Sequence, residues 1–466
     1  MITRQIDVLI CGGGISGLSL GAWLARGGAD VVVLDKNARP GGVIGTIHQD
    51  GFVFERGPNT ILDKHASFNE LIEWAGLEPE IIRAPLSRQK RWVWLKGALR
   101  LVPTGPVAFM ASPLLPLRDK LALLAEPFVK CNPDDETVAD FVRRRLGSGW
   151  LRNLITPMVS GVWAGDPEKI STQYSFPVMK EMERDGGSLI VGAAKRMRRK
   201  RKTIPPEGGT TNRVKSLVSF RDGLDRLPAA LAAKLGDRYH GSTRIERIED
   251  GGDGGFRVVA SGQAWRARHL VVAAEADQAS EWLEPLDSNV SAVLRHFPYN
   301  RLVAMGLGID AGEARVPEGF GFLVPRGEGV RILGAIVNSN FLPGRAPQGC
   351  ATMTIFIGGD LDPAAADLAD DELIGLVKRD LRTAIGWRGE PRSVFIERWP
   401  RAIPQYRMDH GERLRQIEAA EARRPGLHLV GNWRGGVAIA DRIEYTHGLS
   451  RELLGRLPHI TETVEK

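Results

Sequence analysis

The first forty residues constrain the fold more than any other part of the chain. Residues 8–10 are an apolar run typical of a buried strand, and residues 18–24 have the apolar spacing of an amphipathic helix. A second apolar run at 31–34 ends at Asp35. The loop between the first strand and the helix carries the pattern GxGxxG, formed by Gly12, Gly14 and Gly17. This order of elements predicts a doubly wound, Rossmann-like α/β domain.

Each residue of this pattern has its own physical role. Gly12 permits the sharp turn from strand to helix, and Gly17 lets the helix pack closely on the strand. Gly14 lets the backbone approach a pyrophosphate, which the free N–H groups at the helix N-terminus attract. Asp35 follows Gly12 by 23 residues and can accept a hydrogen bond from a ribose hydroxyl. The pattern predicts a dinucleotide site but does not by itself distinguish NAD from FAD.

The next residues make that distinction. DKNARPGGVIGT at 35–46 extends the acid into D-x3-R-x-G-G-x3-T. This extension resembles the second signature of the amine-oxidase-like flavoprotein superfamily, in which the arginine and the glycine pair follow the FAD pyrophosphate toward the flavin. The matching positions are Arg39, Gly41, Gly42 and Thr46. The resemblance therefore implies FAD as the cofactor.

The net charge of +7 is concentrated in one short run. KRMRRKRK at 195–202 carries seven positive charges, so the rest of the 466 residues is neutral (7 − 7 = 0). The run is interpreted as a solvated basic loop, with contact to anionic lipid headgroups as the alternative. It has no interleaved aromatic residues that could stack on bases, so no nucleic-acid partner is expected.

The cysteines and the N-terminus indicate the compartment. Cys11, Cys131 and Cys350 are far apart and form no CxxC, so neither a disulfide framework nor a metal site is predicted. The chain goes directly into a strand pattern, which gives no indication of a signal peptide. We expect a reducing, cytoplasmic location on the inner face of a bacterial membrane.

Residues 89–117 predict a hairpin followed by a possible membrane contact. Arg91 begins an alternating run that turns at Lys96-Gly97 and returns through Leu99 and Leu101. The stretch 101–117 is uncharged but interrupted by four prolines, so it does not predict a membrane-crossing helix. It is either a buried connector or a patch that dips into one leaflet.

Several longer motifs carry a more specific resemblance. GPNT at 57–60, SGVWAGDP at 160–167, GRAP at 344–347 and WPRAIPQY at 399–406 occur in that order. Together they resemble the oxygen-dependent protoporphyrinogen oxidases of haem and chlorophyll synthesis over nearly the whole chain. The coproporphyrinogen oxidases share this fold and chemistry.

The resemblance implies roles for individual residues. Arg91 matches an arginine that pairs with a propionate of the tetrapyrrole, and Asn59 matches a polar residue near the reacting edge of the flavin; these two are the expected catalytic residues. The substrate would also contact a turn, two leucines that sandwich a pyrrole ring and a stacking aromatic. These positions are Gly161, Ala164, Leu323, Leu333 and Phe356.

The resemblance also implies how FAD is held. Ile245 matches a strand residue whose backbone contacts the adenine, and Trp399 matches a residue near the flavin. A C-terminal segment would close over the cofactor. The full set of expected cofactor-binding residues is Gly12, Gly14, Gly17, Asp35, Lys36, Arg39, Gly42, Gly57, Pro58, Asn59, Ile245, Trp399, Gly431, Asn432 and Val437.

The reaction implied is oxidation of protoporphyrinogen IX to protoporphyrin IX. Flavin N5 would take a hydride from a methylene bridge, and molecular oxygen would re-oxidise the flavin and form hydrogen peroxide. The alternatives are oxidation of coproporphyrinogen III, another flavin oxidase or desaturase activity, and a non-catalytic FAD-binding protein. A homodimer is possible within this family.

The expected architecture has three parts. A discontinuous FAD-binding domain comprises 1–85, 222–281 and 425–466. A mixed-sheet substrate-binding domain comprises 86–97, 206–221 and 282–424. A helical domain, expected to associate with a membrane, comprises 98–205. The substrate site would lie between the last two domains.

Overall fold

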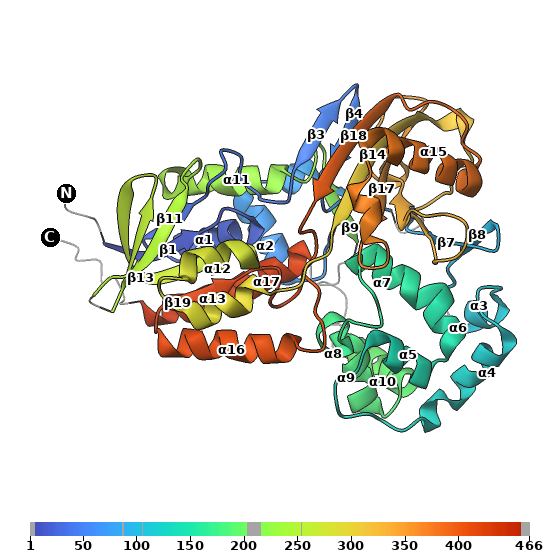
Figure 1. Ribbon diagram of the computed structural model, residues 1–466, viewed down its shortest axis with the longest axis horizontal. Helices are drawn as coiled ribbons and strands as arrows, with labels where there is room; N and C mark the ends of the chain where they lie inside the picture. Colours follow the sequence, from blue (N-terminus) through green and yellow to red (C-terminus); the bar gives the residue numbers. More distant parts are fainter. Residues whose placement is uncertain (1–4, 86–87, 105, 203–215, 253, 458–466) are drawn as a thin grey trace.

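Two large sheets and a group of helices make up the protein (Figure 1). The computed structural model describes residues 5–85, 88–104, 106–202, 216–252 and 254–457. The first sheet lies at the end of the molecule that holds both termini, and the second sheet lies at the other end. The helices of residues 106–202 pack below the second sheet in this view.

The first sheet has the parallel core that the sequence predicts. The strands run in the order β10-β2-β1-β13-β12-β11, and β19 pairs with the far part of β13. Strands β1, β2, β10, β13 and β19 are parallel, whereas β11 and β12 are antiparallel. Their bounds are β1 Gln5–Cys11, β2 Val31–Leu34, β10 Tyr239–His240, β11 Ile245–Asp250, β12 Phe256–Ala260, β13 Gln263–Ala273 and β19 Leu427–Val430.

Helices cover both faces of the first sheet. Val8 and Ile10 of β1 point into one core, and Leu9 and Cys11 point into the other. This alternation explains the continuous apolar run, because a parallel strand is buried on both faces. One core is closed by α1 Ile15–Arg26, α2 Ala66–Ala75, α11 Arg226–Leu235 and α17 Ile439–Arg456, and the other by α12 Ala276–Leu283, α13 Ser288–Arg295 and α16 His410–Arg423.

The second sheet is mixed and contains the predicted hairpin. Its order is β18-β14-β17-β16-β15-β7-β8, with β7 and β15 parallel and the other pairs antiparallel. Helix α15 covers one face. The bounds are β7 Arg91–Leu95, β8 Ala98–Leu101, β14 Leu302–Asp310, β15 Gly321–Leu323, β16 Gly334–Ile336, β17 Cys350–Gly358, β18 Ser393–Trp399 and α15 Asp370–Ile385.

The helical part is held together by a buried ion network. Arg145 is fully buried and contacts the carboxylates of Glu126 at 3.1 Å and Glu183 at 2.5 Å. No helix in the described ranges is long and apolar enough to cross a membrane. The elements are α3 Pro106–Ala111, α4 Leu117–Ala125, η3 Glu126–Phe128, α5 Val138–Arg145, α6 Ser148–Trp150, the π-helix η4 Leu151–Ile155, α7 Thr156–Trp163, α8 Thr172–Ser175, α9 Pro177–Gly186 and α10 Leu189–Lys202.

One expectation about a surface segment is wrong. The basic run 195–202 is the second half of α10 and not a loop, because α10 packs on α9 and Arg196 pairs with Glu181 at 3.1 Å. In the stretch 101–117, Leu114 and Leu115 are buried against the second sheet and the helical core, which favours the buried connector, while Met110 and Leu117 are exposed. Residues 203–215 lie outside the described part of the chain.

Small elements connect the two sheets. Strand β9 joins β5 and β6 in a three-stranded sheet, and β3 pairs with β4. The division into three domains stays a prediction. The remaining elements are β3 Thr46–Gln49, β4 Phe52–Glu55, β5 Ile61–Leu62, η1 Glu78–Glu80, β6 Ile81–Arg83, β9 Leu217–Phe220, η5 Gly236–Arg238, η6 Ala311–Glu313, α14 Asn338–Phe341 and η7 Pro363–Asp367.

Candidate cofactor and substrate site

The three glycines of the first motif differ in what surrounds them. A Cβ on Gly12 would collide with the carbonyl of Ala273, and a Cβ on Gly17 would collide with the carbonyl of Gly12. A Cβ on Gly14 would meet no atom of the described residues within 4 Å. Gly12 and Gly17 are therefore required by the protein itself, whereas Gly14 faces space that the protein leaves open.

The open space adjoins two helix N-termini. Helix α1 begins after Gly14 and α17 begins after Ala438, and neither has a side-chain cap. The hydroxyl oxygens of Ser19 and Thr446 lie 2.8 Å apart, while Gly27, just after α1, lies against Leu454 further along α17. The two helices therefore run parallel. Their uncapped N–H groups lie at the same edge of the first sheet, where they favour an anion.

Asp35 fixes the glycine loop from the end of β2. Its carboxylate accepts hydrogen bonds from the backbone N–H of Gly13 at 2.5 Å and of Asn37 at 2.7 Å. Beside it, burial and then the charge of Asp35 raise the pKa of Tyr239 to about 12. The Tyr239 hydroxyl is buried and has no hydrogen-bond partner among the described residues. It remains free to bond to a ligand, and no sequence motif pointed to Tyr239.

The second signature lies against the first. The N–H of Gly41 donates to the carbonyl of Gly13 at 2.8 Å. The Arg39 guanidinium donates to the carbonyls of Ile44 and Gly42, and no carboxylate in the described part of the chain lies within 4 Å of it. Its charge is thus available to the same open space that Gly14 faces. These residues fit a bound diphosphate.

Asn59 joins the loop after β4 to the second sheet. Its Oδ1 lies 2.7 Å from Nδ2 of Asn338 and 2.7 Å from Oγ1 of Thr354, and its Nδ2 donates to the carbonyl of Gly57 at 3.0 Å. All three polar side chains are buried. Sequence reasoning missed Asn338 and Thr354, because nothing local to 59 indicates which distant residues its amide meets.

Trp399 provides a second connection. Its indole Nε1 donates to the carbonyl of Arg56 at 3.0 Å, and Arg56 forms an ion pair with Glu397 at 2.7 Å. A Cβ on Gly57 would lie 2.9 Å from the carbonyl of Val43. The loop at 56–59 is therefore held between the second FAD signature and the end of β18.

The strand register brings the predicted substrate residues to one face of the second sheet. Arg91 pairs with Gly321, and two residues further along, Val93 pairs with Leu323. Leu323 pairs with Gly334, which pairs with Phe356. Because the side chains of paired residues point to the same face, three predicted residues share it. They are Arg91, Leu323 and Phe356.

Thr354 lies on the same face, since it is two residues from Phe356 in β17. Asn59 therefore touches the face that carries Arg91. The Arg91 side chain is exposed, with its guanidinium carbon 5.7 Å from the centroid of the Phe320 ring. Gly161 of α7 packs on Leu323, where a Cβ would collide with the leucine. The helical part thus adjoins this face.

Leu333 and Ala164 lie deeper. Leu333 is buried in a small cluster with Ala164 and Leu302, and its N–H donates to the carbonyl of Phe356 at 2.8 Å. Ala164 adopts a left-handed conformation (φ 47°), and its carbonyl accepts from Nδ2 of Asn300 at 2.8 Å. The structure places both beside Phe356, and their contact with substrate stays a prediction.

The C-terminal segment is rigidly held. The carbonyl of Asn432 accepts from the Tyr406 hydroxyl at 2.6 Å, and the Arg442 guanidinium is buried against the carbonyls of Gly431 and Arg434. Val437 packs on the helical core immediately before α17. The segment thus leads directly into the uncapped N-terminus of α17.

Comparison with known proteins identifies the family. The family of flavin-containing amine oxidoreductases matches residues 15–441. The chain belongs to this family. Its cofactor is FAD. The rice (Oryza sativa subsp. japonica) chloroplastic protoporphyrinogen oxidase is 32% identical over 94% of this chain and 86% of the relative. The Bacillus subtilis (strain 168) coproporphyrinogen III oxidase is 27% identical over 94% and 95%.

Solved structures agree with this fold. A protein from Exiguobacterium sp. 255-15 superposes with a TM-score of 0.81 over 98% of this chain and 100% of its own, at 23% identity. A cyclohexylamine oxidase from Brevibacterium oxydans IH-35A gives a TM-score of 0.70 over 97% and 99%, at 19% identity. The predicted α/β fold of this flavoprotein is confirmed, and its membrane association is not.

Three predicted cofactor residues lie at the margin of the site. Lys36 is exposed and donates to Oε1 of Gln278 at 3.1 Å. Ile245 is buried at the start of β11, just after a backbone bond from Thr243 to the carbonyl of Asp35 at 2.7 Å. Pro58 is half-buried between Gly57 and Asn59. Their contacts with FAD stay predictions.

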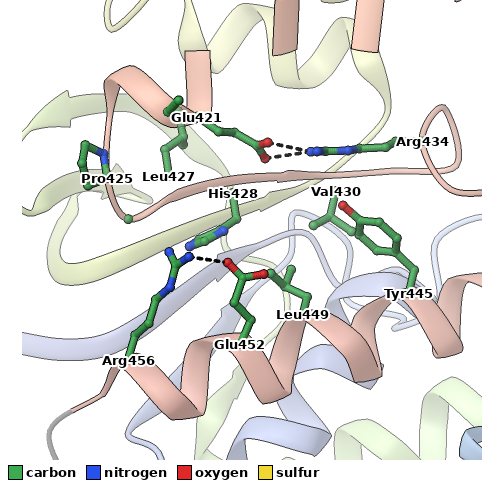
Figure 2. A pocket seen from close by; sticks show the side chains of 12 residues that line it. Glu421, Pro425, Leu427, His428, Val430, Arg434, Tyr445, Leu449, Glu452 and Arg456 are labelled. Carbon is green, nitrogen blue, oxygen red and sulfur yellow. Dashed lines mark hydrogen bonds and ion pairs between the residues drawn. The ribbon is translucent and has the colours of Figure 1, made fainter. Parts of the chain in front are cut away.

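A cavity of about 280 Å³ lies away from this site, between β19, the end of α16 and α17 (Figure 2). Figure 2 shows Glu421 paired with Arg434 on one side of it, at 2.8 Å, and Glu452 paired with Arg456 on the other, at 2.6 Å. Burial lowers the pKa of His428 in its wall to about 4. With its charges paired, the cavity offers no surplus charge to a ligand.

Proposed function

We propose that the flavoprotein oxidises a porphyrinogen, converting protoporphyrinogen IX to protoporphyrin IX with molecular oxygen as acceptor. One observation carries the proposal. The loop that follows the second FAD signature meets the second sheet through Asn59 and Thr354, on the face that also carries Arg91, which forms no ion pair with the residues that the structure describes. The names of the homologues, protoporphyrinogen and coproporphyrinogen oxidases, support the substrate class.

The dimensions of this face suit a tetrapyrrole. Arg91 and Thr354 are separated by three strand spacings, from β7 through β15 and β16 to β17. At about 4.8 Å per spacing, this is roughly 14 Å between the two backbones. A tetrapyrrole whose bridge carbon lies near Asn59 could thus extend a propionate to Arg91, with Leu323 and Phe356 offering an apolar surface between them.

FAD supplies the acceptor for the electrons and hydrogen removed from the ring. The protein's own residues bind the substrate, orient it and exclude water from the site. Asn59, Asn338 and Thr354 hold the loop at 56–59 next to the place of reaction. Arg91 orients a propionate of the substrate. Leu323 and Phe356 displace water from the substrate face. No residue here is assigned as a strong general base.

The decisive experiment is an assay of purified, FAD-loaded protein with protoporphyrinogen IX and coproporphyrinogen III side by side. We expect porphyrin fluorescence to develop with concomitant oxygen consumption. Arg91→Ala should raise KM sharply while flavin content stays constant, with Arg415→Ala, at an exposed arginine on α16, as the control. Absence of fluorescence from both substrates would refute the proposal.

Coproporphyrinogen III is the second candidate substrate. The observation that favours it is a further group of arginines near the same face, described below, whose charge the neighbouring carboxylates only partly compensate. An amine substrate is disfavoured, because the Arg91 cation would repel it and no carboxylate in the described residues compensates that charge.

We also propose that the protein contacts a membrane from one side. Leu117, Leu121, Leu124 and Phe128 follow one helical face of α4 and η3, with exposed fractions of 70%, 53%, 65% and 88%. This stripe lies just after the stretch 101–117 that the sequence indicated. Such an exposed apolar face with Arg118 beside it suits an anionic bilayer surface.

Flotation with anionic liposomes tests this contact. Leu121→Glu/Phe128→Glu should shift the protein from the floating to the soluble fraction. The matched control is Val178→Glu/Met408→Glu, which changes two exposed apolar residues outside the stripe. Equal flotation of the wild type and the stripe variant would refute the contact.

A further inference from the structure

A second cavity, of about 360 Å³, separates the helical part from the loop between β15 and β16. Its wall comes from both sides: α5 to α7 contribute most of it and the loop contributes Arg326. The polar residues that line it are Arg143, Ser148, Arg152, Thr156, Glu168 and Arg326. We refer to it as the arginine cavity.

The arginine cavity has more positive charge than its neighbours compensate. Arg143 forms a two-point ion pair with Glu168, the one carboxylate among the described residues of the wall, and a further pair with Asp140 at 3.3 Å. Arg152 donates to Oδ1 of Asn153 at 3.2 Å and has no carboxylate within 4 Å in the ranges that the structure describes. Two hydroxyls, of Ser148 and Thr156, complete the lining.

Arg326 is held in place but poorly neutralised. Its guanidinium donates to the carbonyls of Arg331 at 3.1 Å and Gly358 at 3.4 Å. Its nearest carboxylate, Asp362, is 3.7 Å away and already makes a closer pair with Arg331 at 2.7 Å. A half-buried cation with so weak a partner is costly to desolvate. An anionic group in the cavity would offset that cost.

The cavity borders the proposed substrate face. Gly358, which Arg326 contacts, is four residues from Thr354 in β17, or roughly 13 Å along the strand at about 3.3 Å per residue. Arg91 lies at a similar distance from Thr354 but across the strands. Helix α7 connects the two regions, since it begins with Thr156 in the cavity wall and carries Gly161 on Leu323.

We propose that Arg152 and Arg326 bind carboxylates that coproporphyrinogen carries and protoporphyrinogen lacks, and so extend the substrate range to coproporphyrinogen. Protoporphyrinogen has propionates on neighbouring rings only, which one cation site can serve. Coproporphyrinogen has one propionate on each ring, so its propionates extend from all sides of the macrocycle. Arg91 lies across the strands from Thr354, and Arg326 lies along the strand from it, which matches this arrangement. The inference rests on the proposed function and specifies its substrate range.

The test compares two double variants with equal loss of charge. Arg152→Gln/Arg326→Gln removes Arg152, which has no carboxylate partner among the described residues, and Arg326, whose partner Asp362 is shared with Arg331. Arg415→Gln/Arg392→Gln removes two exposed arginines outside the cavity. With FAD-loaded protein, the first variant should raise KM for coproporphyrinogen III about ten-fold, as expected for loss of a charge-assisted contact. Its kcat should stay within about two-fold, and its KM for protoporphyrinogen IX within about three-fold; the control should match the wild type.

A binding measurement separates failure of this inference from failure of the proposed function. Oxidised coproporphyrin III is titrated into the protein, and quenching of tryptophan fluorescence gives Kd without turnover. Weaker binding of coproporphyrin III, but not of protoporphyrin IX, by the cavity variant supports the inference even if no oxidation is detected. Equal changes for both porphyrins, or none, would overturn it. Arg152→Gln alone, at an exposed position, repeats the test without disturbing the half-buried Arg326.

Discussion

Alanine at Gly14 should weaken FAD binding without destabilising the protein, whereas alanine at Gly17 should destabilise it. Gly14 has φ −73° and ψ 178°, which alanine adopts freely, and its Cβ would enter open space. Gly14 is also the N-cap of α1, where alanine is less favourable than glycine by some tenths of a kcal/mol. Reduced entropy of the unfolded chain offsets this by about 0.4–1 kcal/mol. The net change in the free energy of unfolding should be close to zero.

The Gly17 variant provides the contrast. Its Cβ would collide with the carbonyl of Gly12, so α1 must move away from β1. Such overpacking costs about 1–3 kcal/mol. For Gly14→Ala, the methyl group occupies space that the diphosphate needs, and losing one such contact should weaken FAD binding at least about ten-fold.

The assay measures both quantities on the same preparations. Urea unfolding of flavin-free protein gives the stability, and titration with FAD gives Kd. The reasoning is refuted if Gly14→Ala binds FAD as tightly as the wild type. It is also refuted if flavin-free Gly14→Ala loses as much stability as Gly17→Ala, since Gly14 would then be needed by the protein itself.

Three further predictions concern buried polar groups. Burial lowers the pKa of His410 from 6.5 to about 4, so the unfolded chain takes up this proton before the native state does. Stability should therefore fall as pH decreases from about 6.5 to about 4, by on the order of 3 kcal/mol. His410→Phe should flatten the pH dependence of the urea midpoint across that range, and the exposed His296→Phe should not. Arg145→Met should cost about 3–5 kcal/mol, because it removes the cation that pairs with the buried Glu126, while Glu183 keeps Arg144 and Lys180; a smaller loss in urea unfolding would argue against the network. Asn59→Leu should lower the free energy of unfolding by about 1–3 kcal/mol, because the buried Nδ2 of Asn338 loses its acceptor although Thr354 still donates to Oδ1 of Asn338, and thermal unfolding that matches the wild type would contradict this.

Local sequence patterns were sufficient to predict individual strands, turns and helices. The first strand, the glycine turn and the following helix lie within about twenty residues, and the hairpin at 91–101 turns at Lys96 and Gly97, both with positive φ. In each case, the residues that determine the geometry are close in sequence. The exposed stripe of α4 was harder to predict, because its leucines are interleaved with charged residues that lower the mean hydropathy of any continuous window.

Long-range contacts could not be predicted in this way. Asn338 and Thr354 are 279 and 295 residues from Asn59, and no periodicity connects them. The basic run at 195–202 was misinterpreted for a related reason. Like charges disfavour an isolated helix, but ion pairs from α10 to Glu181 and Asp185 of α9 stabilise this one.

The glycines of the second sheet explain why one of its faces can serve both the cofactor domain and a ligand. Gly306 and Gly308 of β14 lie on this face, and a Cβ on either would collide with Phe54 or Phe52 of β4. The missing side chains thus admit the hairpin that follows the second FAD signature. Nearer to β7, Gly321 and Gly334 serve the backbone itself, because a Cβ on either would collide with a carbonyl of the neighbouring strand. Removal of side chains from a pleated surface therefore docks the FAD-binding part on the β14 half of this face, whereas the half next to Arg91 carries Leu323 and Phe356, the side chains of the proposed substrate contact.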